Sequence, residues 1–262
     1  MFLIFPATRP GGAQDTSWKS NHDAAKTAFD EHRYGDAEKL YLLALAQAKE
    51  FGEDDPRLAT SFLDVGIVCY VRKHYEEAES NLKRAVGIGE KLQGADQVLL
   101  GKALQQLAEV YRAEKRYAEA EPLYRRALSI FENTSNAEQQ QEASIYLDLA
   151  LMYSAQGRYG DAEPLYVRAV PLFEKAYGRE HVSVAYSLYD LAELYQNEEK
   201  YAEAEPCYEE ALAIFEKTTG PESPNVAMAL ESYAHLLRKT SRDAEAKELE
   251  ERAKKIRKHK AQ

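Results

Sequence analysis

Six histidines and two cysteines are the residues of this sequence that could hold a metal ion or act as nucleophiles. The histidines are His22, His32, His74, His181, His235 and His259. No two of them are three or four residues apart, the spacing that places two metal ligands on one face of a helix. Cys69 and Cys207 lack the paired spacing of a zinc site. We therefore predict no metal site, and we interpret both cysteines as small core residues.

The segment from Gly94 to Ala103 has the pattern Gly-x6-Gly-Lys-Ala and superficially resembles a phosphate-binding loop. Such a loop needs four residues between its glycines and a serine or threonine after the lysine. Here six residues separate the glycines, and Ala103 follows Lys102. The sequence also lacks a nucleophile elbow and a dinucleotide-binding loop. We therefore predict a protein that has no catalytic residues and needs no cofactor.

Charge and hydropathy argue against two further classes of function. The 262 residues include 34 Lys and Arg against 44 Asp and Glu, which gives a formal net charge of −10. A protein that binds nucleic acid needs a basic surface to displace the counterions of the phosphates. No segment approaches the ~18 consecutive apolar residues of a membrane span. We therefore expect neither a nucleic-acid partner nor a membrane span.

The first 17 residues are interpreted separately from the rest of the chain. They open with the apolar run Met1–Phe5, which has no basic residue before it. A secretory signal needs a basic start and an apolar stretch of roughly 7–15 residues. We therefore interpret residues 1–17 as a flexible leader and expect a cytoplasmic protein, which suits two cysteines without a disulfide framework. The alternative is the remnant of a signal segment, in which case the protein is exported.

The string Tyr-x-x-Ala-Glu occurs five times and defines an internal repeat. Its alanines are Ala37, Ala78, Ala120, Ala162 and Ala204, and Ala246 marks a sixth copy that has lost the tyrosine. Successive alanines are 41 or 42 residues apart, and a second alanine follows each of them by seven residues. A fixed period of this length is typical of proteins that are built from stacked structural units.

Each repeat predicts two helices. In the first helix, apolar residues recur at helical spacing, as in Leu104, Leu107, Ala108 and Tyr111. The second helix has one apolar stripe, as in residues 120–131. Short polar segments, many of them with glycine, separate the helices and the repeats. The sequence therefore predicts an all-α protein in which small residues let paired helices approach closely.

The motif at residues 117–128 and 159–170, Tyr-x-x-Ala-Glu-Pro-Leu-Tyr-x-Arg-Ala, resembles the tetratricopeptide repeat. Its 42-residue period is similar to that of the longer variety found in kinesin light chains, and the resemblance covers about residues 18–258. It implies a right-handed superhelical solenoid of about six helix-turn-helix repeats, forming one domain over residues 18–262 with a C-terminal capping helix. The chain is not identified as a kinesin light chain itself, because the heptad segment of those proteins is absent.

The resemblance also implies a binding surface. In that family the first helix of each repeat lines a concave groove, where a Leu-Asn-Asn-Leu-Ala string supplies asparagines that bind an extended peptide. The matching strings here, such as residues 104–108 and 188–192, contain no asparagine. We therefore predict a non-catalytic scaffold that binds a peptide or protein segment of a different kind. The candidate groove residues are Asp64, Lys102, Gln105, Glu109, Arg112, Leu147, Asp148, Leu151, Tyr186, Tyr189, Asp190, Glu193 and Glu231.

Acidic residues outnumber basic ones at these positions, and Asp148, Asp190 and Glu193 form an acidic patch in the fourth and fifth repeats. One interpretation is a partner that carries lysine or arginine, because opposite charges set specificity and association rate. The other is solvated surface charge in an acidic protein. Two further functions stay open at this point. The chain could be an architectural or self-associating module, or the regulatory half of a separately encoded enzyme.

Overall fold

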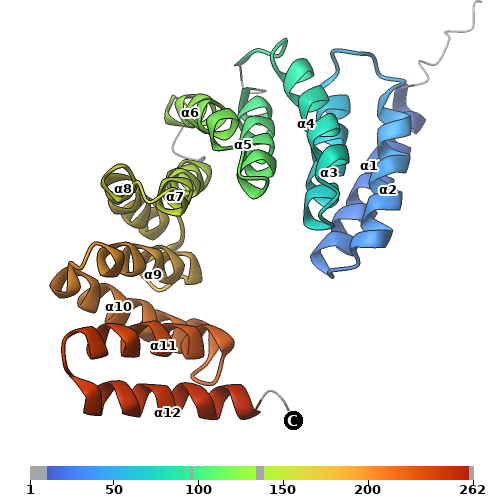
Figure 1. The fold of residues 1–262 in the computed structure, drawn as a ribbon. Coiled ribbons are helices and arrows are strands. Elements are labelled where there is room, and N and C mark those ends of the chain that lie inside the picture. Colours follow the sequence, from blue (N-terminus) through green and yellow to red (C-terminus); the bar gives the residue numbers. More distant parts are fainter. Residues whose placement is uncertain (1–10, 95–96, 134–138, 260–262) are drawn as a thin grey trace, which may run out of the picture. The chain divides into compact units, whose positions relative to one another are not determined.

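The computed structural model describes residues 11–94, 97–133 and 139–259, and these residues form twelve α-helices. In chain order they are α1 (Gly11–Asp30), α2 (Tyr34–Ala48), α3 (Pro56–Val71), α4 (Tyr75–Gly89), α5 (Gln97–Ala113), α6 (Tyr117–Glu132), α7 (Gln139–Ala155), α8 (Tyr159–Tyr177), α9 (Val182–Asn197), α10 (Tyr201–Thr219), α11 (Pro224–Lys239) and α12 (Asp243–His259). Consecutive helices pair into hairpins, from α1–α2 to α11–α12 (Figure 1). The predicted all-α fold of about six helix-turn-helix repeats is therefore confirmed.

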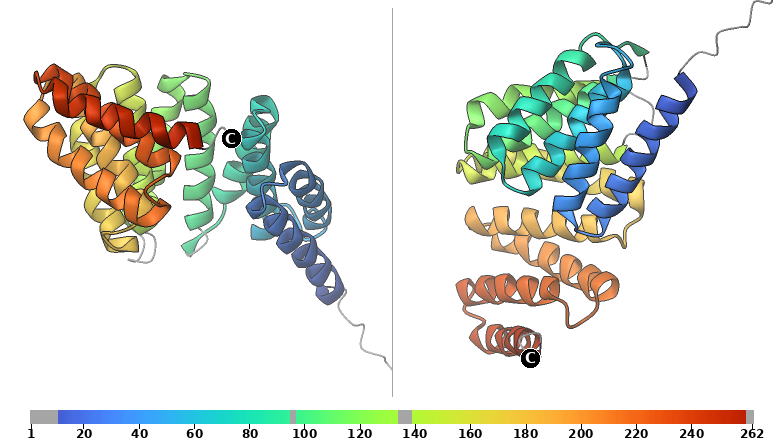
Figure 2. Two further views of the ribbon diagram at one scale, coloured as in Figure 1. Left: turned by 90° about the horizontal axis from the view of Figure 1, so that it is seen from below. Right: turned by 90° about the vertical axis from the view of Figure 1, so that its right-hand side faces the viewer.

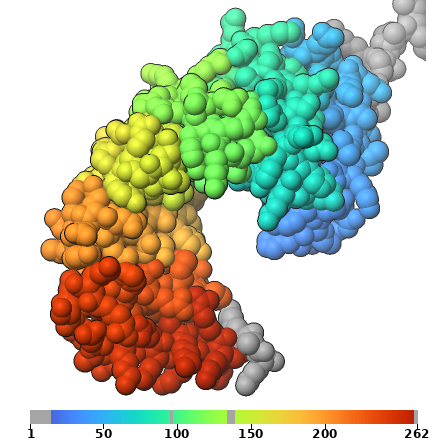
Figure 3. Space-filling view, in the orientation of Figure 1, coloured from blue at the N-terminus to red at the C-terminus, as the bar shows by residue number. Residues whose placement is uncertain are grey.

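The chain divides into two compact units, Met1–Ile130 and Phe131–Gln262. We call them the N-terminal unit, which holds α1 to α5 and nearly all of α6, and the C-terminal unit, which holds α7 to α12. Within them, α1 lies beside α2 and α11 beside α12 in each view (Figure 2). In the space-filling view the helices of each unit form a continuous body of side chains (Figure 3). The right-handed course of a single solenoid over residues 18–262 stays a prediction.

The repeated alanines lie where the two helices of a hairpin cross. The six alanines from Ala37 to Ala246 have no exposed surface, and those that follow by seven residues are at most 1% exposed. The first helices also carry small residues, and at Gly66 of α3 an added Cβ would lie 2.6 Å from Cγ of Leu82 in α4. A larger side chain at such a position would push the paired helices apart.

Buried tyrosines pack against these alanines in the second helices. Tyr124, Tyr166 and Tyr208 are at most 1% exposed, and each lies four residues after a repeated alanine. A buried hydroxyl needs a hydrogen-bond partner. The Tyr208 hydroxyl donates to Glu193 in the preceding helix at 2.6 Å, and the Tyr124 hydroxyl donates to Glu109 in the same way. These hydrogen bonds connect the buried face of the second helix to a glutamate of the first helix.

Each hairpin turns at a residue with left-handed backbone conformation. These residues are His32, Lys73, Lys115, Gly157, Glu199 and Ser241, with φ between 59° and 71°. The amide of the next residue donates to a carbonyl five residues earlier, as Arg116 N does to Tyr111 O at 2.8 Å. This bond closes the first helix with a Schellman-type cap. Five of the six turns therefore place a side chain in a conformation that favours glycine.

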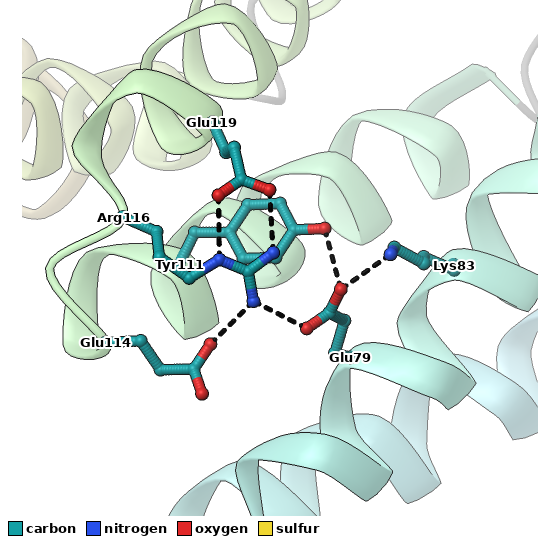
Figure 4. Close-up of polar contacts among 6 residues, drawn as sticks. All are labelled: Glu79, Lys83, Tyr111, Glu114, Arg116 and Glu119. Carbon is teal, nitrogen blue, oxygen red and sulfur yellow. Dashed lines mark hydrogen bonds and ion pairs between the residues drawn. The ribbon is translucent and has the colours of Figure 1, made fainter.

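Ion pairs connect several neighbouring repeats at positions that also recur. The glutamate of the Tyr-x-x-Ala-Glu string pairs with the cation that precedes the tyrosine of the next copy, as Glu79 does with Arg116 at 2.7 Å (Figure 4). The pair of Glu163 with Lys200 follows the same rule, and Glu205 pairs with Arg242 at the corresponding position of the sixth copy, which has Asp243 in place of the tyrosine. Because these side chains are exposed to solvent, each pair stabilises the junction only weakly.

Helix α1 begins at Gly11, so it includes residues 11–17, which the sequence analysis assigned to a leader. Asp15 forms an ion pair with Arg57 of α3 at 2.7 Å. The side-chain amide of Gln47 in α2 donates to the Ser17 hydroxyl at 2.6 Å. These contacts attach the start of α1 to the helices that follow it. The rest of the predicted leader, residues 1–10, lies outside the described residues.

Candidate ligand-binding site

A cavity of about 480 Å³ lies between helices α7, α8 and α9 of the C-terminal unit. Its lining residues are Gln140, Ser144, Leu147, Phe173, Tyr177, Ser183, Tyr186 and Asp190. The rings of Tyr177 and Tyr186 are each 38% exposed, so they face solvent as well as the cavity. Asp190 is the one carboxylate among these described lining residues. The cavity therefore combines apolar and aromatic walls with a single acidic group.

Two helix ends position the aromatic wall. Helix α8 stops at Gly178, which has a φ of 90° and donates its amide to the carbonyl of Glu174 at 2.8 Å. Tyr177 therefore lies in the last turn of α8, and its ring stacks on the imidazole of His181 with centroids 4.2 Å apart. The Nδ1 atom of His181 accepts a hydrogen bond from the amide of Ser183 at 3.2 Å, which caps the start of α9.

Asp190 is a mostly buried carboxyl group on the face of α9 that lines the cavity. Burial raises its pKa to about 7, and the negative charge of Glu193, one turn further along the helix, adds to the increase. The Glu193 carboxylate accepts a hydrogen bond from the neutral Tyr208 hydroxyl. In the part of the chain that the structure describes, neither carboxylate has an ion-pair partner. Such an arrangement favours the binding of a cation from outside the unit.

The N-terminal unit has an aspartate at the equivalent position, and there the aspartate is paired. Asp64 lies 126 residues, or three repeats, before Asp190. Its Oδ2 atom is 2.9 Å from Nε2 of His22, and this contact raises the pKa of the imidazole. In the C-terminal unit Leu147 takes the place of His22, since the first repeat is one residue shorter than the others. The aspartate has therefore lost its cation.

Glu193 differs from its counterpart in the same way. Glu109 lies two repeats earlier and forms an ion pair with Arg112 at 2.7 Å. Burial raises the pKa of Glu109, but the hydrogen bond and charge of Arg112 outweigh this effect and lower the pKa overall. Gln196 stands in the C-terminal unit where Arg112 stands in the N-terminal unit. A neutral side chain has again replaced a cation.

A third cation of the N-terminal unit covers the aromatic ring of Phe51. Arg57 stacks on Phe51, with its Cζ atom 3.5 Å from the ring centroid, and forms an ion pair with Asp15 of α1 at 2.7 Å. The residues 126 positions after Phe51 and Arg57 are Tyr177 and Ser183. The C-terminal unit therefore keeps the aromatic ring but has serine in place of the arginine that covers it.

The N-terminal unit also has a cavity on its equivalent helices, and basic residues line that cavity together with its acids. It measures about 340 Å³ and is lined by His22 and Lys26 of α1 together with Asp30 and Asp64. Each acid there has a basic residue among its neighbours in the lining. The two units thus share an architecture and differ in whether the chain itself supplies the positive charge.

The thirteen candidate residues from the sequence fall into three groups. Leu147, Tyr186 and Asp190 line the cavity. Asp148, Leu151, Tyr189 and Glu193 lie elsewhere on α7 and α9. The remaining six are Asp64 in α3, Lys102, Gln105, Glu109 and Arg112 in α5, and Glu231 in α11. Of these, Gln105 is only 8% exposed. Glu231 pairs with Arg257 at 2.6 Å.

Five residues that line the cavity were not among the candidates. They are Gln140, Ser144, Phe173, Tyr177 and Ser183. Two of them belong to α8, a second helix, whereas the sequence analysis placed the binding surface on first helices alone. A comparison of equal positions in successive repeats could have found Ser183, because it stands where the second repeat has an arginine.

Metal ligands, reactive thiols and membrane-spanning helices would indicate other kinds of site in the described residues. Within these ranges no group of three or more His, Cys, Asp or Glu side chains is arranged to hold a metal ion. Cys69 is buried and Cys207 is half-buried, and burial raises the pKa of both thiols, to about 11 for Cys207. Neither thiol is therefore activated as a nucleophile. No helix in these ranges has the length and apolar character needed to cross a bilayer.

Comparisons with known proteins identify relatives of this architecture. A family model described as tetratricopeptide repeat matches residues 16–91, 66–133, 99–175, 141–198 and 183–259. The crystal structure of BtubC (BKLC) from P. vanneervenii is 21% identical, covers 95% of this chain and 92% of that chain, and has a TM-score of 0.72. No curated protein matches the chain.

Two further solved structures are similar to this chain. A putative kinesin light chain of Podosopora anserina, with nearly identical repeats, is 25% identical, with coverage of 76% and 95% and a TM-score of 0.63. YrrB, described as a protein of this repeat class with an unusual peptide-binding site, is 18% identical, with coverage of 81% and 92% and a TM-score of 0.55. The likeness therefore extends to chains of kinesin-light-chain type.

Proposed function

This chain belongs to the tetratricopeptide repeat family, and we propose that it is a non-catalytic scaffold that binds a peptide or protein segment. The observation that carries the proposal is the cavity between α7, α8 and α9, which is open, mostly apolar and acidic at one point. The presence of a peptide-binding site in YrrB supports the choice of a peptide as ligand. The cavity also favours a ligand-binding role over a purely architectural one, because an architectural module needs no cavity.

The ligand carries a basic side chain that binds beside Asp190. The His22–Asp64 pair is the chain's own example of a cation at the equivalent position. Desolvation around a mostly buried carboxylate strengthens the attraction to a cation compared with an exposed pair. The neighbouring charge of Glu193 acts in the same direction. Apolar walls contribute the rest of the affinity, and charge sets which partner is selected.

A random peptide library displayed on phage, selected on the immobilised full chain, tests this function. We expect enrichment of peptides with lysine or arginine beside an apolar residue, and loss of their binding to the Asp190→Asn variant. Glu222→Gln is the matched control, because it removes an exposed negative charge in the same unit without touching the cavity. Selected peptides without basic residues, or equal binding to Asp190→Asn, would refute the proposed ligand.

Self-association is a second candidate function, and one observation favours it. Leu42 and Leu43 are adjacent in α2 and are 48% and 54% exposed. Apolar surface of this kind is typical of contact sites between proteins. Light scattering over a dilution series would show a concentration-dependent mass if copies of the chain associate, and Leu43→Ser should lower that mass.

We also propose a cytoplasmic location. Both cysteines of the described structure are free thiols, which a reducing compartment preserves. Fractionation of cells that produce the full chain, with detection in the cytoplasmic fraction, is the corresponding test. Recovery outside the cell would support the exported alternative instead.

A further inference from the structure

The N-terminal unit shows how this architecture binds an arginine side chain. The guanidinium of Arg57 donates from Nε and Nη2 to the two carboxylate oxygens of Asp55, at 2.9 and 2.8 Å. Its Nη1 donates to Asp15 at 2.7 Å, and its plane covers the Phe51 ring. This combination of a paired carboxylate and an aromatic face suits the flat, weakly hydrated guanidinium group.

The C-terminal unit keeps the aromatic ring beside that arginine but neither the arginine nor its two carboxylates, because His181 stands in the place of Asp55 and Gln140 in the place of Asp15. Tyr177 stands in the place of Phe51, and Ser183 in the place of Arg57. The Tyr177 ring and the Tyr186 ring, one helical turn after Ser183, remain partly exposed at the cavity. Asp190 lies two turns after Ser183 on the same face of α9. Aromatic surface and a carboxylate are therefore present together around empty space.

We propose that this cavity is an arginine-binding pocket, in which a guanidinium from the partner binds beside Tyr177, Tyr186 and Asp190. The proposal rests on the proposed function and names the side chain that the peptide must supply. The guanidinium lies against the exposed parts of Tyr177 and Tyr186, and its charge is directed to Asp190. The alkyl part of the side chain contacts Leu147 at the cavity wall.

Arginine fits these surroundings better than lysine does. An ammonium group is compact and strongly hydrated, and the aromatic wall cannot replace the water that it would lose. A guanidinium loses less hydration and gains from stacking, which contributes about 0.5–1 kcal/mol at an exposed aromatic ring and about 2 where water is excluded. Gln140, Ser144 and Ser183 add oxygen atoms that can accept its remaining N–H groups.

Three pentapeptide libraries test the proposal on the full chain. Each has one fixed central residue, arginine, lysine or citrulline, and random residues elsewhere, and citrulline is a neutral group of nearly the same shape as arginine. We expect the immobilised chain to retain the arginine library about 5-fold more than the lysine library, and more still than the citrulline library.

Two variants show whether the retained peptides occupy this cavity. Ser183→Arg places the arginine of the N-terminal unit in the C-terminal unit, and Asp190→Asn removes the charge. Each should bring retention of the arginine library down to that of the citrulline library. Glu222→Gln is the matched control and should bind like the unmodified chain. Circular dichroism checks that all three variants are folded.

The outcomes separate the two proposals. Equal or stronger retention of the lysine library would overturn the arginine pocket and leave a basic-peptide scaffold standing. Unchanged retention by Ser183→Arg would show that arginine binds elsewhere on the chain. If no library is retained while display-selected peptides still bind, the arginine pocket is wrong and the scaffold function survives. If neither approach yields a binder, both proposals fail.

Discussion

Replacing Asp190 with asparagine should stabilise the C-terminal unit, and the gain should grow as the pH rises. In the folded protein, burial and the charge of Glu193 raise the pKa of Asp190 from its ordinary value near 3.8 to about 7. In the unfolded chain the pKa returns to its ordinary value. Between these two values the folded state binds more protons than the unfolded state, so the wild-type chain loses stability as the pH rises toward 7.

The size of this effect follows from the two pKa values. One pKa unit corresponds to ~1.36 kcal/mol, so the penalty above pH 7 is on the order of 4 kcal/mol if the site does not relax. Water entering the open cavity reduces it, and we expect about 2–4 kcal/mol. At about pH 5 most of the penalty is absent, because the folded carboxyl group is then protonated. The gain from Asp190→Asn should therefore be larger at pH 8 than at pH 5, by up to about 2.5 kcal/mol if the site does not relax and by less if it does.

Urea denaturation of the full chain at these two pH values measures the difference. The unfolding transition of the C-terminal unit should move to higher urea in Asp190→Asn at pH 8, and move much less at pH 5. Glu222→Gln controls for the loss of one negative charge and should leave both transitions nearly unchanged. An equal gain at both pH values, or a loss of stability at pH 8, would refute the argument that Asp190 is ionised at a free-energy penalty. A penalty of this kind is expected where a residue is retained for binding.

Three further predictions follow from the same contacts. Replacing His22 with alanine leaves Asp64 buried without its partner, so the free energy of unfolding of the N-terminal unit should fall by about 1–3 kcal/mol. Urea denaturation at pH 6 measures this loss, and unchanged stability would contradict the pairing. Lys115→Gly should raise the free energy of unfolding by about 0.5–1 kcal/mol, and Gly157→Ala should lower it by a similar amount, because both positions have a positive φ. Thermal denaturation measures both changes, and opposite signs would contradict this account of the turns. The affinity of a selected basic peptide should rise about tenfold from pH 6 to pH 8, because the peptide binds the ionised form of Asp190; calorimetry should show no such rise for Asp190→Asn.

Local periodicity was sufficient to predict the hairpins. The helices α4, α6, α8 and α10 begin at Tyr75, Tyr117, Tyr159 and Tyr201, which are the tyrosines of the repeated string. An alanine column and a tyrosine four residues after it define one buried face, and a fixed period carries that face from hairpin to hairpin. Helix α1 begins earlier than expected because contacts with α2 and α3, rather than its own apolar pattern, hold its first turns.

The candidate site could be predicted only in part. Asp190 was a candidate because its negative charge lies at a position expected to face the groove. Asp64 and Glu109 were candidates on the same grounds. The structure shows that His22 and Arg112 lie within ion-pair distance of the last two. An ion pair between helices depends on which side chain of the neighbouring repeat points at the carboxylate, and a 42-residue period does not specify this. The loss of the paired cation could be recognised only by comparing equivalent positions in space.

Hydrogen–deuterium exchange of the full chain with a display-selected basic peptide tests the central claim most directly. The claim is that the partner binds to the C-terminal unit and not to the N-terminal unit, where Asp64 is paired with His22. We expect slower exchange in α7, in the end of α8 and in the first turns of α9, with no change in α1 to α5. Protection confined to the N-terminal unit, or protection that persists in Asp190→Asn, would contradict it.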